Sequence, residues 1–270
     1  MATKYPLVNY SGQIKEIATT DVISIANGVT GESVISGWMA LGACTYVSAD
    51  SPTFVMNMAG DATSYLSLGN RIKLTQTTVK YFVVTAIGAY VAGVTPITLY
   101  GGTDYTLANT AITLPYFSLH KAPFGFPLNP TKWNIEIIST TFDKQPSAVN
   151  GTFYNLASLQ INVPIGAWKI GLECTAYSAS TAAQTNVNIF IGLSGVNNGF
   201  DEGKLMGMFN VSGASGALVV HGVMARKIDV MLTSKKTYYL IVETNQLGNA
   251  ELGTRGSAGT TCLKAEFLYL

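Results

Sequence analysis

Charged side chains are scarce in this chain of 270 residues. They make up 11% of it, against about 25% in an ordinary soluble domain, and the formal net charge is only +1. A surface with so little charge suits a protein that is covered by contacts with other copies or other proteins, so we expect a component of an assembly. The basic pairs Arg226-Lys227 and Lys235-Lys236 are too short to form a basic stripe, and we therefore expect no nucleic-acid binding.

Cysteine and histidine are also sparse. Cys44, Cys174 and Cys262 form no CxxC pair, which argues against a zinc site and a disulfide framework and predicts buried free thiols. His120 and His221 are the only side chains with an ordinary pKa near neutrality, and we expect both to be unreactive strand residues. The sequence therefore predicts a protein that is not an enzyme and needs no metal or cofactor.

Long apolar runs are missing as well. No stretch of about 20 apolar residues could form a membrane-spanning helix, so we expect no membrane insertion. Residues 1–6 lack the apolar segment of a secretory signal. A protein of this kind that acts outside a cell would need another exit route, such as lysis.

What the chain does contain is β-strand sequence broken by turns. Arg71–Gln76 alternates apolar and polar residues, and Val79–Ile87 is an almost continuous β-branched and aromatic run. Ala122–Pro130 holds three prolines, which predicts an extended crossing segment instead of a central strand. We expect an all-β chain with an N-terminal arm (1–33), a small antiparallel barrel or sandwich domain (34–132), a linker (133–150) and a second domain (151–270).

The second domain has the clearest pattern. From Trp168 to Ala176 every second residue is apolar or small, which predicts a strand with one buried face. Tyr238–Val242 is apolar on both faces, and burial at a subunit interface is one explanation. Eight strand candidates separated by Gly, Ser and Asn predict a jelly-roll sandwich, and they begin near Leu159, Ala167, Asn186, Lys204, Ala217, Ile228, Thr237 and Thr261.

The opening Tyr5–Ile17, with its Ser11-Gly12-Gln13 turn and Asp21 beyond, resembles the openings of many tailed-bacteriophage fibre and appendage proteins. Leu68–Lys73 through Leu99–Tyr105 is similar to a domain in phage structural proteins. The second domain resembles the trimeric jelly-roll heads of phage fibres, which share their shape with the tumour-necrosis-factor and C1q group. This resemblance implies a homotrimeric virion protein, assembled in the host cytoplasm and released by lysis.

In that interpretation the arm binds other virion proteins through Tyr5, Leu7, Val8 and Ile14. The head attaches to the host, and exposed aromatic and amide side chains could hold a host-surface glycan. The candidates are Phe200, Asp201, Tyr177, Asn245 and Asn249. Two alternatives remain open, a capsid or baseplate decoration protein without a receptor, and a polysaccharide depolymerase with two acidic residues in a cleft.

Overall fold

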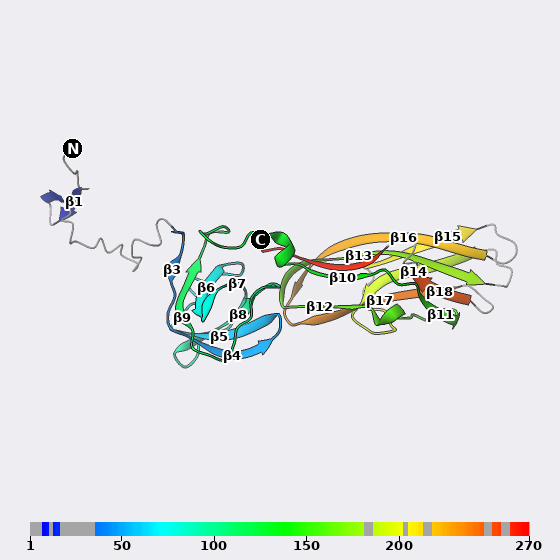
Figure 1. The fold of residues 1–270 in the computed structure, drawn as a ribbon, viewed down its shortest axis with the longest axis horizontal. Helices are drawn as coiled ribbons and strands as arrows, with labels where there is room; N and C mark the ends of the chain where they lie inside the picture. Colours follow the sequence, from blue (N-terminus) through cyan, green and yellow to red (C-terminus); the bar gives the residue numbers. More distant parts are fainter. Residues whose placement is uncertain are drawn as a thin grey trace.

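The computed structural model describes residues 7–10, 13–16, 36–180, 186–201, 205–212, 218–245, 250–254 and 260–269. Within these ranges the regular elements are β-strands and two short 3-10 turns, η1 (Pro130–Lys132) and η2 (Leu156–Ser158). The predicted all-β class is confirmed. Two bodies lie end to end along the long axis (Figure 1).

The opening residues contain a small antiparallel pair, β1 (Leu7–Tyr10) and β2 (Gln13–Glu16). Leu7, Val8 and Ile14 lie on these strands, although their side chains fall outside what the structure describes. Tyr5 lies outside the described residues altogether. The proposed anchoring contacts of the arm therefore stay a prediction.

A seven-stranded antiparallel sheet forms the first body, in the order β3-β9-β6-β7-β8-β5-β4. Residues beside β3 and on β4, at opposite ends of this order, share one hydrophobic cluster with the central strands. The sheet therefore curls around its own core, as the predicted small barrel requires. Its strands are β3 (Met39–Ala40), β4 (Cys44–Asp50), β5 (Thr53–Ala59), β6 (Arg71–Gln76), β7 (Thr78–Ile87), β8 (Val94–Tyr100) and β9 (Thr113–Ser118).

Two sheets packed face to face form the second body. The first has the order β10-β19-β13-β18-β11, with β16 on the other edge of β13, and the second has the order β12-β17-β14-β15. The strands are β10 (Ile135–Ser139), β11 (Asp143–Ala148), β12 (Gln160–Val163), β13 (Gly166–Ser180), β14 (Asn186–Ser194), β15 (Met206–Ser212), β16 (Leu218–Leu232), β17 (Lys236–Thr244), β18 (Ala250–Thr254) and β19 (Thr261–Phe267).

The order of these strands is that of a jelly roll. β10 and β11 together correspond to the first strand of a jelly roll, and β18 and β19 together correspond to its last strand. The last strand lies between the first strand and β13. The remaining neighbours, β12 with β17, β17 with β14 and β14 with β15, complete two four-strand layers. The expected sandwich is thus confirmed in its topology.

Two details differ from the sequence expectation. The segment 133–150 does not merely link the two bodies, because β10 and β11 pair within the six-stranded sheet. Ile228 does not begin a new strand, because β16 continues through it in unbroken register with β13. Polar residues and one proline make β11 hard to recognise in the sequence, and the length of β16 hid its continuity.

Alternation along β13 follows the prediction. Trp168, Ile170 and Cys174 are completely buried, whereas Glu173 on the other face is exposed. β17 is buried on both faces, and Ile241, which points away from the central core, is 0% exposed within the single chain. The single chain therefore already buries Ile241, whereas Tyr239 on the same face of β17 stays partly exposed.

Aromatic side chains join the two bodies. Tyr100, the last residue of β8, is 1% exposed and lies 5.1 Å from the Trp168 ring and 4.8 Å from the Phe267 ring, measured between centroids. Its hydroxyl donates a hydrogen bond of 2.8 Å to the carbonyl oxygen of Trp133. Because one buried cluster includes residues of both bodies, the barrel and the jelly roll form a continuous core.

Candidate functional site

Three of the predicted glycan-binding residues follow strands of the four-stranded sheet, at two different ends of it, whereas Tyr177 lies on β13 of the six-stranded sheet. Phe200 and Asp201 follow the last residue of β14, Ser194, whereas Asn245 follows β17 beside Asn188 near the start of β14. Six residues of strand separate Asn188 from Ser194, which corresponds to about 20 Å. Phe200 and Asp201 therefore lie apart from Asn245, and Asn249 lies outside the described part of the chain.

The Asp201 carboxylate accepts hydrogen bonds from residues of its own loop. Its Oδ1 atom accepts hydrogen bonds from the Ser194 hydroxyl at 2.8 Å and from the Gly195 amide at 2.7 Å. Lys236 Nζ lies 3.7 Å from its other carboxylate oxygen. These contacts close the loop after β14, so the Asp201 carboxylate has a structural role.

Phe200 is half-exposed and stacks on Phe153, with 5.7 Å between ring centroids. One ring face is thus already covered by a neighbouring aromatic. Asn245 is also paired, because its Oδ1 atom accepts from the Asn188 amide at 2.6 Å. Of the candidates in the described ranges, Phe200 alone presents a large exposed aromatic surface.

Tyr177 is buried, at 4% exposure, which differs from the exposed position expected for a glycan contact. Its ring stacks on Phe142 at 5.1 Å between centroids, and its hydroxyl donates to Glu251. Lys144 binds the same Glu251 carboxylate at 2.8 Å. The hydrogen bonds from Lys144 and from Tyr177 hold the pKa of Glu251 below its usual value.

Charge in the jelly roll is gathered on one face. The outer face of the six-stranded sheet carries alternating acids and bases, with Lys227 and Glu266 joined at 2.7 Å. The strand register places these charged side chains on one side of the sheet, so the sequence reveals the pattern only when the strand pairing is known. The charged side chains on this face are Glu136, Lys169, Glu173, Lys227, Asp229, Lys264 and Glu266.

The outer face of the four-stranded sheet is nearly free of charge. Met208 is 53% exposed there, and Phe190 and Tyr239 are partly exposed. Glu243 is the one acidic or basic residue on this face among the described residues, and burial raises its pKa. The other residues of the face include Gln160, Asn162, Thr237, Ile241, Asn186, Asn188, Gly192, Ser194, Met206 and Asn210.

A depression of about 400 Å³ interrupts the charged face above Gly171. Glu136 and Glu173 both border it, the arrangement that a depolymerase would need, but both are exposed and no aromatic side chain lines it. A glycosidase acid needs an apolar enclosure that raises its pKa. The depression therefore lacks the environment for that chemistry.

Cys262 borders the same depression, and its Sγ atom lies 3.3 Å from Glu136 Oε1. Desolvation and this neighbouring carboxylate raise the pKa of the thiol to about 11. Burial likewise raises the pKa of Cys44 to about 12 and that of Cys174 to about 11. A thiol that stays protonated is a poor nucleophile, so these cysteines are unsuited to covalent catalysis.

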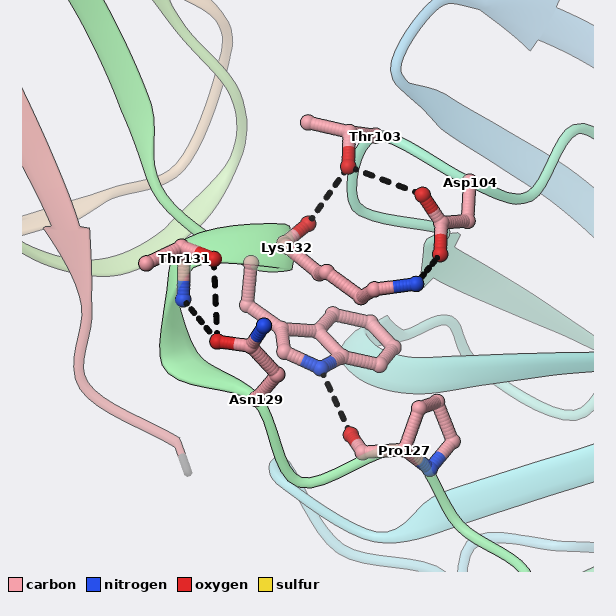
Figure 2. Close-up of polar contacts among 7 residues, drawn as sticks. Thr103, Asp104, Pro127, Asn129, Thr131 and Lys132 are labelled. Carbon is pink, nitrogen blue, oxygen red and sulfur yellow. Dashed lines mark hydrogen bonds and ion pairs between the residues drawn. The ribbon is translucent and has the colours of Figure 1, made fainter.

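Polar contacts fix the connection between the two bodies (Figure 2). Lys132 forms an ion pair with Asp104, and the Thr103 hydroxyl donates to the Lys132 carbonyl at 3.3 Å. Gly102, at a φ of +63°, lets the two segments approach, because a Cβ there would collide with the Lys132 carbonyl. These polar contacts and the aromatic core beneath them join the end of the barrel to the start of the jelly roll.

The turn η1 is itself held in place from within. Asn129 Oδ1 accepts hydrogen bonds from the amide and hydroxyl of Thr131, at 3.1 and 2.9 Å. The indole of Trp133 donates to the Pro127 carbonyl at 2.9 Å, as Figure 2 shows. The proline-rich crossing predicted at 122–130 is thus tied to the start of the jelly roll.

In the ranges that the structure covers, no three His, Cys, Asp or Glu side chains are grouped to hold a metal ion. Nor does any helix there have the length and apolar character to cross a bilayer.

No family model matches the chain, and no curated protein matches it. Solved structures give only weak similarities. The structure of the infectious bursal disease virus Gx strain is 14% identical, with 84% of this chain and 58% of that chain covered and a TM-score of 0.29. The VP2 subviral particle of the same virus is also 14% identical, with 85% and 63% covered and a TM-score of 0.26.

Dimeric latent PorU from Porphyromonas gingivalis is 9% identical, with 86% of this chain and 24% of that chain covered and a TM-score of 0.28. This chain therefore spans less than two thirds of each of these structures. At such TM-scores the similarities assign neither a fold family nor a function.

Proposed function

We propose that this protein is a non-enzymatic structural component of a tailed-bacteriophage virion. It is a homotrimeric fibre or appendage protein that is displayed on the particle and attaches it to the host. The proposal rests on the resemblance of its opening residues and on the separation of charge in the jelly roll. One outer face carries the ion pairs that suit contact with water, and the opposite face is almost uncharged.

The uncharged face is the subunit interface in this proposal. Charged residues are depleted, and methionine and aromatic residues enriched, at the centres of protein interfaces, and Met208, Phe190 and Tyr239 fit that composition. A trimer would present three copies of any weak attachment site, which raises avidity through effective concentration. The barrel and the arm would then lie between the head and the particle.

Light scattering coupled to size exclusion tests the assembly. We expect a mass of three times the 28.7 kDa chain. Met208→Lys places a charge in the proposed interface and should yield single chains. Thr175→Lys, which adds the same charge to the opposite face, should leave the trimer intact.

A monodisperse single chain in the unaltered protein would contradict the proposed assembly. Adsorption of the purified trimer to host cells tests attachment separately. A trimer that binds the particle but no cell would identify a decoration protein instead.

A further inference from the structure

We propose that Asn150 is a modification site, at which the folded chain loses a side-chain amide by spontaneous deamidation and gains a carboxylate. Asn150 precedes Gly151 in the turn that follows β11, and both residues are exposed. Asparagine is a thermally labile residue, and a following glycine, which has no Cβ, lets the next backbone nitrogen approach the side chain closely. This inference is independent of the virion role proposed above.

The reaction consumes only water. A new bond joins the Gly151 backbone nitrogen to the Cγ atom of Asn150, and the bond between Cγ and Nδ2 breaks. The Gly151 amide proton leaves with Nδ2 as ammonia, and a five-membered succinimide ring remains. Water then breaks one of the two carbon–nitrogen bonds of that ring, which gives aspartate or isoaspartate at position 150.

The turn around Asn150 leaves its side chain free to react. The Thr152 amide donates to the Val149 carbonyl at 3.1 Å and closes the turn over Asn150 and Gly151. Gly151 has a φ of +74°, and no atom lies within 4 Å of the position that a Cβ would take there. Within the described part of the chain, the Asn150 side chain forms no hydrogen bond that would have to break first.

The attacking nitrogen is also weakly held. The Gly151 amide donates to the Thr244 carbonyl at 3.4 Å, which is longer than the usual distance of about 2.9 Å. A small movement of the turn is enough to break so long a contact. The nitrogen of Gly151 can therefore approach the side chain of Asn150 without a large rearrangement of the jelly roll.

A second Asn-Gly pair in the same chain provides a comparison. Asn198, in the loop after β14, is also exposed, and the Gly199 amide donates to the Val196 carbonyl at 3.3 Å. The Asn198 side chain is held, however, because its Oδ1 atom accepts a hydrogen bond of 2.6 Å from the Asn155 backbone amide. The fold therefore protects Asn198 and leaves Asn150 reactive, although the two dipeptides are identical.

The product would alter a chain that has almost no net charge. The formal net charge is +1, so the negative charge gained at Asn150 cancels it, and a net charge near zero promotes association. Isoaspartate would also add a methylene to the backbone of the turn between β11 and η2. The site would thus couple the age of a chain to its surface charge.

Peptide mapping of the full chain by mass spectrometry tests this assignment. Trypsin places Asn150 in the peptide 145–169 and Asn198 in the peptide 170–204, so one digest of protein incubated at mildly alkaline pH reports both. We expect Asn150 to deamidate about five to ten times faster than Asn198, the factor that one additional hydrogen bond supplies. In concentrated urea the two rates should become equal, because the protection comes from the fold.

Two variants locate the reaction within the peptide. Asn150→Gln keeps an amide but lengthens the side chain, so the five-membered ring cannot close and the peptide 145–169 should keep its mass. Asn162→Gln is the matched control, because Asn162 is exposed in the same peptide but precedes Val163, and its peptide should still gain mass. Fragment ions identify the altered residue.

Every other outcome counts against the proposal. Equal rates in the folded chain, or faster reaction at Asn198, would show that the fold does not select Asn150. Reaction at Asn150 in urea but not in the folded chain would show that the turn blocks the attack. A mass increase that persists in Asn150→Gln would place the modification at another residue.

Discussion

Removing one hydroxyl from the buried junction tests whether the barrel and the jelly roll unfold together. The Tyr100 hydroxyl donates to the Trp133 carbonyl at 2.8 Å inside the joint core. Tyr100→Phe keeps the ring and its contacts and leaves that carbonyl without this donor. A buried hydrogen bond contributes about 1 kcal/mol, and a stranded acceptor costs roughly 1–3 kcal/mol, so we expect a loss of about 2 kcal/mol.

Calorimetry can resolve this change. For a chain of this size 1 kcal/mol shifts Tm by about 2 °C, so Tyr100→Phe should melt roughly 4 °C lower in a single transition. Tyr100→Ala also deletes the ring between Trp168 and Phe267 and should split the transition in two, as the bodies lose their common core. Tyr90→Phe, at a half-exposed position, is the control and should change stability by less than about 0.5 kcal/mol.

The same side chain predicts a response to pH. Burial raises the pKa of Tyr100 above its ordinary value, so the folded chain keeps a proton that the unfolded chain loses above about pH 10. Stability should fall as the pH rises past that point, and less steeply in Tyr100→Phe. A single transition for Tyr100→Ala, or a Tm for Tyr100→Phe equal to that of the unaltered protein, would show that the Tyr100 junction does not couple the two bodies.

Three further predictions concern the jelly roll. Gly253→Ala would force a Cβ against the Tyr177 ring, and urea unfolding should show a loss of about 1–3 kcal/mol. Because Lys144 lowers the pKa of Glu251, the contribution of this ion pair to folding stability should disappear as the pH falls through the lowered pKa. In thermal melts from pH 7 to 3, Glu251→Gln should therefore lose less stability towards low pH than the unaltered protein. Cys262, with a pKa of about 11, should react with iodoacetamide at pH 7.5 more slowly than free cysteine, as mass spectrometry can measure; equal rates would refute the raised pKa.

The alternation of apolar and polar residues within a segment was enough to predict the strands that have one face in the core. β13 shows this most clearly, because Trp168 and Cys174 fall on the buried face that the pattern indicated. The sequence could not show which strands become neighbours, and charge sorting depends on that pairing. Lys169 and Glu266, nearly a hundred positions apart, face the same side only because β13 pairs with β19.

Candidate binding residues were harder to predict for a related reason. Tyr177 resembles an exposed aromatic in its own segment, but Phe142 and Glu251 cover it from distant strands. The surroundings of Leu114 depend on a bulge in β9 and on Phe124, which lines the same depression beyond that strand, and neither has a local sequence signature. Segments remote from one another in the chain create both environments.

The order of strands in the jelly roll has a consequence for synthesis on the ribosome. All seven barrel strands lie before residue 119, so the barrel can fold while later residues are still being translated. The sandwich has to wait, because β19 completes it by inserting between β10 and β13. Until Thr261–Phe267 has left the exit tunnel, the edges of β10 and β13 remain open to neighbouring nascent chains. A chain whose synthesis stops before this strand would thus have a folded barrel and an incomplete sandwich, whose open strand edges can pair with other chains.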